Sequence, residues 1–169
     1  MRSLLDFLYN AAAVLAALFL VGTLAMVLVG IAGRIVGFHL PGTDAYAGYC
    51  MAGAGFLALA HTLRRGEHIR VTLILERLTG TAHRALSLWT LCAGAVLAAL
   101  FAWYSVRLAW QSLDFNDIST GNDATPLWIP QSTMAMGTVI FAIAMIDELL
   151  LEIRGRRRAA GPAEMLRNE

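Results

Sequence analysis

Ionisable side chains are scarce in this chain, and residues 64–78 hold one of its dense groups of them. The segment reads Arg-Arg-Gly-Glu-His-Ile-Arg-Val-Thr-Leu-Ile-Leu-Glu-Arg-Leu. Its aliphatic residues follow the i, i+3, i+4, i+7 spacing of one helix face: Val71, Ile74, Leu75 and Leu78. Such an amphipathic helix lies in a membrane surface, with its arginines toward the lipid headgroups. The spacing therefore predicts an interfacial helix at about residues 66–79.

A second, smaller apolar stripe, Ile69 and Leu73, accompanies the first. Because a helix that only floats on lipid needs one apolar face, the second stripe favours a platform for a partner protein. A plain basic loop that only sets the topology is the alternative. An ion pair between Glu67 and Arg70 would contribute a few tenths of a kcal/mol, about 0.2–0.5. We predict nine residues in contact with a partner or the membrane: Arg64, Arg65, Glu67, His68, Ile69, Arg70, Leu73, Arg77 and Trp128.

Other candidate chemistry is weak. Asp114, Asp117 and Asp123 resemble a calcium loop only superficially, because the spacing and terminal Glu of an EF-hand are missing. His61 stands alone near the end of an apolar stretch, where a hydrogen bond to a neighbour is commoner than ligation. The roles of His61 and Arg107 stay open at this stage. We expect no catalytic residue, no metal and no cofactor on this chain.

Several motifs of enzymes and pumps are absent from the sequence. It has no Walker motif, no HExxH and no GxSxG. No acidic residue lies in the middle of an apolar stretch, and no two histidines could hold a haem between helices. The chain is therefore expected not to act alone as an enzyme or a pump.

The elements that position these residues are long apolar stretches. Of the 169 residues, 58% are hydrophobic and 15% are charged, against roughly 25% charged in a soluble domain. The net charge of +1 makes nucleic acid an unlikely partner. We predict an all-α integral membrane protein with four transmembrane helices, since each stretch approaches or exceeds the ~20 residues that cross a bilayer. The expected spans are about 8–33, 45–63, 85–107 and 126–150, in a domain of residues 1–153 followed by a polar tail, 154–169.

The arginines indicate the orientation. They concentrate in residues 64–84 and in the C-terminal tail, with Arg2 at the N-terminus. By the positive-inside rule, both termini and the 64–84 segment are cytoplasmic, and the 34–44 and 111–127 connections face outward. Six aromatic residues are expected at the outer membrane boundary: Tyr46, Tyr49, Trp103, Tyr104, Trp110 and Trp128.

Small residues are expected where helices touch, because they let membrane helices approach closely. The second span carries Gly48, Ala52, Gly53, Ala54 and Gly55. The first span ends with Gly30, Gly33 and Gly37, of which the last two form a GxxxG pair.

Two stretches resemble a known family. The Gly-Glu-His-Ile-Arg-Val run at 66–71 and the Pro-Leu-Trp-Ile-Pro entry to the fourth span, 126–130, look like the small integral membrane (Q-type) subunit of tripartite ATP-independent periplasmic (TRAP) transporters. The resemblance covers most of the chain, from the first span to the end of the fourth.

The resemblance implies a non-catalytic subunit in a bacterial inner membrane. Its partners would be a large membrane subunit that holds the substrate and sodium sites, a periplasmic solute-binding protein, and lipids. The small subunit would brace the large one during sodium-driven import of an organic acid, such as a C4-dicarboxylate or a sugar acid. Two other classes stay open: a membrane anchor of a redox enzyme that binds quinone or haem, and a small self-contained channel or exporter.

Overall fold

A computed structural model describes residues 2–38, 40–64 and 81–154. This part of the chain forms four α-helices: α1 (Arg2–Val36), α2 (Thr43–Arg64), α4 (Thr81–Asp114) and α5 (Trp128–Ile153). Its only β-pairing is one isolated bridge between Ile118 and Pro126. The expected interfacial helix at 66–79 and the tail beyond Arg154 lie outside the described residues. The all-α prediction is confirmed.

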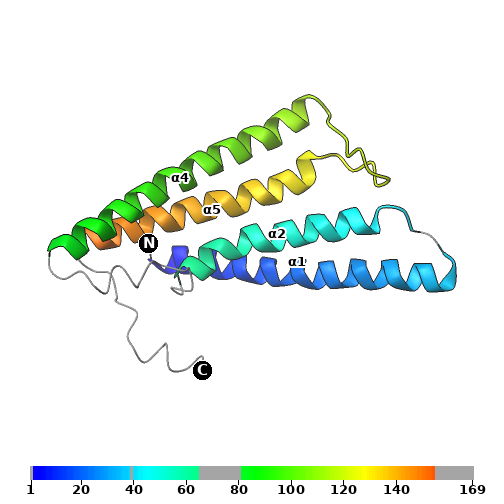
Figure 1. The fold of residues 1–169 in the computed structure, drawn as a ribbon, viewed down its shortest axis with the longest axis horizontal. Coiled ribbons are helices and arrows are strands. Elements are labelled where there is room, and N and C mark those ends of the chain that lie inside the picture. The colour runs from blue at the N-terminus through cyan, green and yellow to red at the C-terminus, as the bar shows by residue number, and fades with distance from the viewer. Residues whose placement is uncertain (1, 39, 65–80, 155–169) are drawn as a thin grey trace, which may run out of the picture.

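The helices lie side by side in one layer, in the order α1, α2, α5, α4 (Figure 1). Helix α2 packs against α1 and α5, and α4 packs mainly against α5. The α1–α2 and α4–α5 hairpins diverge toward the end that carries the 37–42 and 115–127 connections. We call this end the loop end and the opposite one the terminal end.

Three of the helices are long and apolar enough to cross a membrane: Leu5–Val36, Arg84–Asp114 and Trp128–Ile153. Helix α2 has 22 residues, a length of about 33 Å at 1.5 Å per residue. It is not among the three because its glycines, tyrosines and His61 keep its mean hydropathy lower. Helix α4 continues to Asp114, beyond the end expected near 107.

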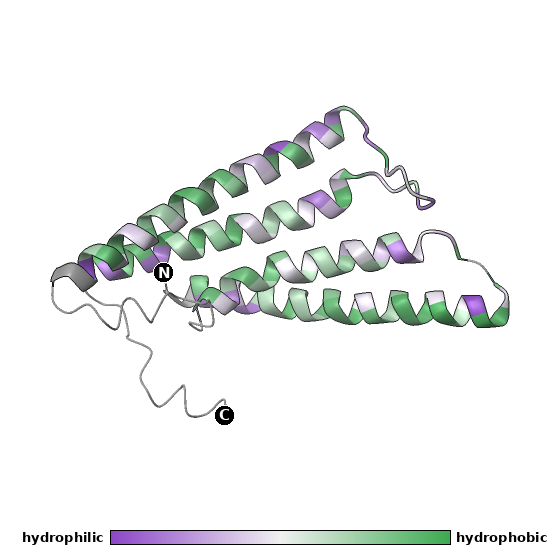
Figure 2. Cartoon of the chain, viewed as in Figure 1, coloured by the Kyte–Doolittle hydropathy of each residue, from purple (hydrophilic) through white to green (hydrophobic). Residues whose placement is uncertain are grey.

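Apolar residues make up most of each helix, and hydrophilic residues gather at the helix ends and in the 115–127 loop (Figure 2). In the 18-residue apolar stretch of each candidate span, the share of residues buried inside the chain is 6% for α1 and 39% for α5, the highest of the three. Helix α5 is therefore central to the packing of this layer, whereas α1 forms an edge.

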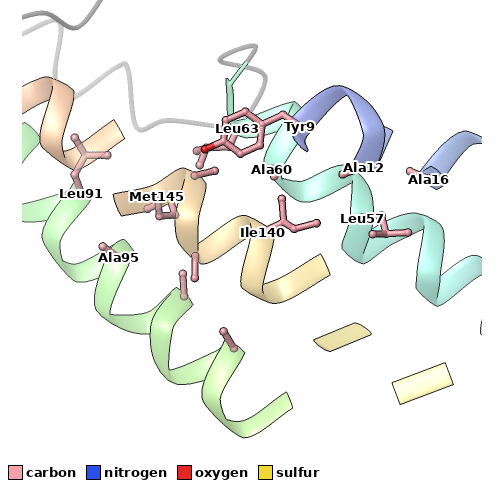
Figure 3. Close-up of a cluster of buried hydrophobic side chains, with 14 residues drawn as sticks. Tyr9, Ala12, Ala16, Leu57, Ala60, Leu63, Leu91, Ala95, Ile140 and Met145 are labelled. Atoms are coloured by element: carbon pink, nitrogen blue, oxygen red, sulfur yellow. The ribbon is translucent and has the colours of Figure 1, made fainter. Parts of the chain in front are cut away.

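The buried cluster lies toward the terminal end and draws on all four helices (Figure 3). Tyr9 of α1 is 2% exposed, beside Leu63 of α2. Most other members are alanines, together with Leu57, Leu91, Ile140 and Met145. Small side chains let the helix backbones approach closely, which is how membrane helices associate without a hydrophobic drive.

The end of α1 corrects one expectation. Gly37 has φ +76°, and the N–H of Phe38 donates a 2.9 Å hydrogen bond to the carbonyl of Gly33. This is the bond of a Schellman helix end, which glycine favours because it adopts positive φ without strain. A Cβ at Gly37 would meet nothing within 4 Å. Gly37 therefore ends α1, and no other helix of the described chain packs against the Gly33–Gly37 pair.

Candidate functional site

Most of the nine predicted contact residues lie in the 65–80 segment, outside the described residues. Arg64 is the last residue of α2, and Trp128 is the first residue of α5. Trp128 is 39% exposed at the loop end, and its role as a membrane anchor stays a prediction. Pro126 precedes α5, and Pro130 falls in its first turn, where the missing N–H costs no helical hydrogen bond.

The loop end holds a polar cluster that joins α2 to the loop between α4 and α5. The Tyr49 hydroxyl of α2 donates to Asp123 Oδ2 over 3.0 Å and lies 3.1 Å from Ser119 Oγ. Ser119 Oγ in turn donates to Asp123 Oδ1 over 2.8 Å. Both carboxylate oxygens of Asp123 are thus bound, one by α2 and one from within the α4–α5 loop.

A second tyrosine strengthens the same junction. Thr125 Oγ1 donates to the Tyr46 hydroxyl oxygen over 3.1 Å. The rings of Tyr46 and Tyr49 meet edge to face, with centroids 6.2 Å apart, an arrangement that aromatic pairs favour. Tyr46 and Tyr49 are three residues apart, so one face of α2 presents both. We call the set Tyr46, Tyr49, Ser119, Asp123 and Thr125 the loop-end latch.

The backbone of the 115–127 loop shapes it for this contact. Ser119 N–H donates to the Thr125 carbonyl over 2.8 Å, and Leu127 N–H donates to the Asp117 carbonyl over 2.9 Å. Gly42, at φ +85°, immediately precedes α2 and lies so close to the loop that a Cβ there would stand 2.7 Å from Asp123 Cβ. The loop is therefore folded back against the start of α2, which joins the two diverging hairpins.

Hydrogen bonds lower the pKa of Asp123 from 3.8 to about 2, with Thr125 the largest cause, followed by Ser119 and Tyr49; partial desolvation opposes them. Hydrogen bonds to the ionised form favour that form. The Thr125 hydroxyl thus acts on both Asp123 and Tyr46. The latch is thus held by a carboxylate that is ionised at neutral pH.

Between the latch and the terminal end, two glycines let α2 and α5 approach closely. A Cβ at Gly137 of α5 would stand 2.6 Å from the carbonyl carbon of Phe56. A Cβ at Gly53 of α2 would stand 3.1 Å from both Phe19 and Thr133. Gly53 and Ala54 are buried as expected, but Gly48, Ala52 and Gly55 are exposed. Within the described chain, burial therefore supports helix contacts for Gly53 and Ala54, and for the other three residues the contact stays a prediction.

The α4–α5 seam is made of small residues on both helices. Helix α4 contributes Ala95, Ala98, Ala102 and Ser105, and α5 contributes Ala135, Thr138 and Ala142. The two buried hydroxyls bond to carbonyls of their own helices, Ser105 to Phe101 over 2.8 Å and Thr138 to Ala135 over 2.9 Å. Such internal bonds let a hydroxyl lie in an apolar seam without an unpaired donor.

An open cavity of about 260 Å³ lies between α1 and α2 at the loop end, lined by Gly30, Phe38 and Thr43 among others. An ion pair between Arg34 and Asp44, 3.4 Å apart and largely exposed, lies at its rim. Exposed pairs of this kind contribute roughly 0–1 kcal/mol.

Sequence reasoning missed the latch. It flagged the aspartates of the loop only as a poor calcium site, and it placed both tyrosines at the lipid boundary. The signal available was the three-residue spacing of Tyr46 and Tyr49 together with a hydroxyl-rich acidic loop. In the described ranges, no three His, Cys, Asp or Glu side chains gather where they could hold a metal.

The apolar helices and their small-residue seams define an all-helical integral membrane protein. Residues 23–155 match the family model of the tripartite ATP-independent periplasmic transporters, DctQ component. The match covers well over half of the chain, so the chain belongs to this family and is the small membrane subunit of a TRAP transporter. No curated protein and no solved structure matches it. The resemblance drawn from residues 66–71 and 126–130 is confirmed.

Proposed function

We propose that this chain braces the large membrane subunit of a TRAP transporter during sodium-driven import of an organic acid. The cargo would be a C4-dicarboxylate or a sugar acid delivered by a periplasmic binding protein. The family match over residues 23–155 carries the proposal. A protein that braces another needs a fixed shape, and the latch and the two glycine contacts provide one by holding the hairpins to each other.

The proposal includes four membrane-spanning helices, with α2 as the fourth. Helix α2 packs against α1 and α5, so neighbouring helices cover two of its sides. A helix that shows little surface to lipid needs less apolar surface than one that stands alone. Both termini would lie in the cytoplasm of a bacterium with this chain in its inner membrane, and the loop end would face the periplasm, in line with the arginine distribution.

Residues 66–79 would form an interfacial helix on the cytoplasmic side. Glu67, Arg70 and the Ile69/Leu73 stripe would hold this helix against neighbouring helices or the large subunit. The other proposed contact residues of this region are Arg64, Arg65, His68 and Arg77.

Reconstitution tests the function directly. The large subunit is placed in liposomes with and without this chain, with binding protein, labelled organic acid and an inward sodium gradient. We expect uptake only when both membrane subunits are present and only with sodium. Uptake by the large subunit alone at the full rate would contradict the bracing role.

A charge reversal tests the interfacial segment. Glu67→Arg should reduce both co-purification with the large subunit and uptake, and Glu67→Gln should reduce them less because it removes a charge without reversing it. Undiminished complex and uptake with Glu67→Arg would remove this residue from the proposal.

A further inference from the structure

The edge of α4 that faces away from α5 carries polar side chains within its apolar length. The residues of α4 that face α5 are buried and small. On the other side Trp103 is 68% exposed, Tyr104 is 61% exposed, and Arg107 is exposed as well. Throughout the described ranges, no hydrogen bond or ion pair involves any of these three side chains. We call Trp103, Tyr104 and Arg107 the α4 polar edge.

The length of α4 gives the depth of this edge in a bilayer. From Arg84 to Asp114, the charged residues at the two ends of the apolar region, the helix rises about 45 Å. That rise equals a bilayer with its headgroups, about 40–45 Å, so the midplane falls near residue 99. The hydrocarbon, about 30 Å thick, then runs roughly from residue 89 to residue 109.

On this register Trp89 and Trp110 fall at the two boundaries, where indole rings are favoured. Trp103 lies about 6 Å from the midplane and Arg107 about 12 Å. On this register all three residues of the polar edge lie inside the hydrocarbon, deeper than the outer boundary that the sequence analysis expected for Trp103 and Tyr104. Lipid tails offer no acceptor to an indole N–H, a phenol or a guanidinium, so leaving these groups unpaired there costs free energy.

The opposite edge of the layer is different. Helix α1 exposes Leu18, Val21, Leu24 and Leu28, and no Asp, Glu, Lys, Arg or His lies between positions 7 and 33. This aliphatic edge suits lipid. The two outer edges of the helix layer therefore differ, since the α1 edge is aliphatic and the α4 edge carries polar side chains.

We propose that the α4 polar edge docks a transmembrane helix of the large membrane subunit, which presents a carboxylate to Arg107 and hydrogen-bond acceptors to Trp103 and Tyr104. This rests on the proposed function, which supplies a large membrane partner. Aromatic residues and arginine are the types that dominate the centres of protein interfaces. A lipid phosphate could be reached by Arg107 but not by the Trp103 indole, about 9 Å below the boundary.

Two variants test the edge in the complex. Arg107→Glu and Trp103→Ala should each weaken binding of the large subunit at least about tenfold, measured by pull-down of the purified large subunit in detergent. The matched control is Leu24→Ala on α1, which should leave binding unchanged. Because no hydrogen bond or ion pair of the described chain involves the polar edge, thermal unfolding of the isolated variants should stay close to that of the unchanged chain.

Photocrosslinking distinguishes protein from lipid. A photoreactive phenylalanine analogue at position 103 should crosslink to the large subunit in native membranes, and the same analogue at position 24 should crosslink to lipid. Crosslinking of position 103 to lipid alone, or full binding by Arg107→Glu and Trp103→Ala, would overturn the inference. Absence of any binding between the unchanged chain and the large subunit would instead defeat the proposed function.

Discussion

Gly137 of α5 lies directly against the backbone of Phe56 of α2. A Cβ at position 137 would stand 2.6 Å from the Phe56 carbonyl carbon, 2.7 Å from its oxygen and 2.8 Å from its Cβ. Two of these three atoms are main-chain atoms of a helix, which cannot turn aside as a side chain can. The contact between α2 and α5 is also the main one that joins the two hairpins. The distance between α2 and α5 therefore depends on the absence of a side chain at position 137.

Gly137→Ala should separate α2 from α5 and destabilise the chain by about 1–3 kcal/mol, the usual cost of overpacking. The measurement is thermal or denaturant unfolding of the detergent-solubilised chain. In the transporter, the same substitution should lower the uptake rate if the hairpins must hold a fixed angle.

Two glycines serve as matched controls for this substitution. At Gly94 the new Cβ would meet the terminal Cε of Met145 at 2.5 Å, and a flexible methionine side chain can move away at small cost. At Gly55 it would meet nothing within 4 Å. A loss of stability at Gly55→Ala as large as that at Gly137→Ala would show that glycine itself, and not the Phe56 contact, is responsible.

Tyr49→Phe should loosen the 115–127 loop without changing the helices. The substitution keeps the ring and removes the hydroxyl that donates to Asp123 Oδ2. We expect faster amide hydrogen exchange at Ser119 and Leu127, whose N–H groups bond across the loop, with unchanged exchange in α4 and α5. Tyr104→Phe, which removes an exposed hydroxyl on α4, is the control and should leave the loop unchanged.

The latch should also respond to acid, in a direction set by Asp123. Because its pKa is lowered from 3.8 to about 2, folding favours the ionised form, and the stabilisation is complete above pH 4. It is lost as the pH falls through about 2. The carboxyl carbon resonance of Asp123 should therefore titrate with a midpoint near 2 in the unchanged chain.

The same titration ranks the hydrogen bonds. Thr125→Val should move the midpoint toward 3.8 by more than Tyr49→Phe does, because the Thr125 hydroxyl is the largest cause of the shift. Equal midpoints in Thr125→Val and the unchanged chain would remove that hydroxyl from the explanation.

The helices could be predicted because the solvent dictates them: a backbone in lipid must satisfy its own hydrogen bonds. Helix ends and rotations were harder. Helix α4 runs to Asp114 because beyond the apolar region water can solvate polar helical side chains, so hydropathy alone did not mark its end. Which of Gly48, Gly53 and Gly55 faces a neighbour depends on how α2 is rotated, and neighbours on two sides set that rotation.

The loop-end latch could not be predicted from the sequence either, and the reason is a different one. Tyr49 and Asp123 are 74 positions apart, and a tyrosine near a helix end equally suits a lipid boundary. Only the fold of the 115–127 loop brings the carboxylate to α2. Hydrophobic pattern holds no information about that loop, because its residues are held by hydrogen bonds and by backbone conformations with positive φ, such as those of Asn116 and Ala124.

Gly42 and Gly37 offer a last test, because they separate backbone strain from contact. Both have positive φ, +85° and +76°, so alanine at either position pays the strain of a left-handed conformation, roughly 1–2 kcal/mol. Only at Gly42 would the added Cβ also meet another segment, 2.7 Å from Asp123 Cβ. Gly37→Ala should therefore lower the thermal stability of the chain and leave exchange in the 115–127 loop unchanged. Gly42→Ala should lower stability further and also expose the loop, since its Cβ displaces Asp123 from Tyr49. Equal amide hydrogen exchange in the 115–127 loop of both variants would show that the contact with Gly42 does not hold this loop in place.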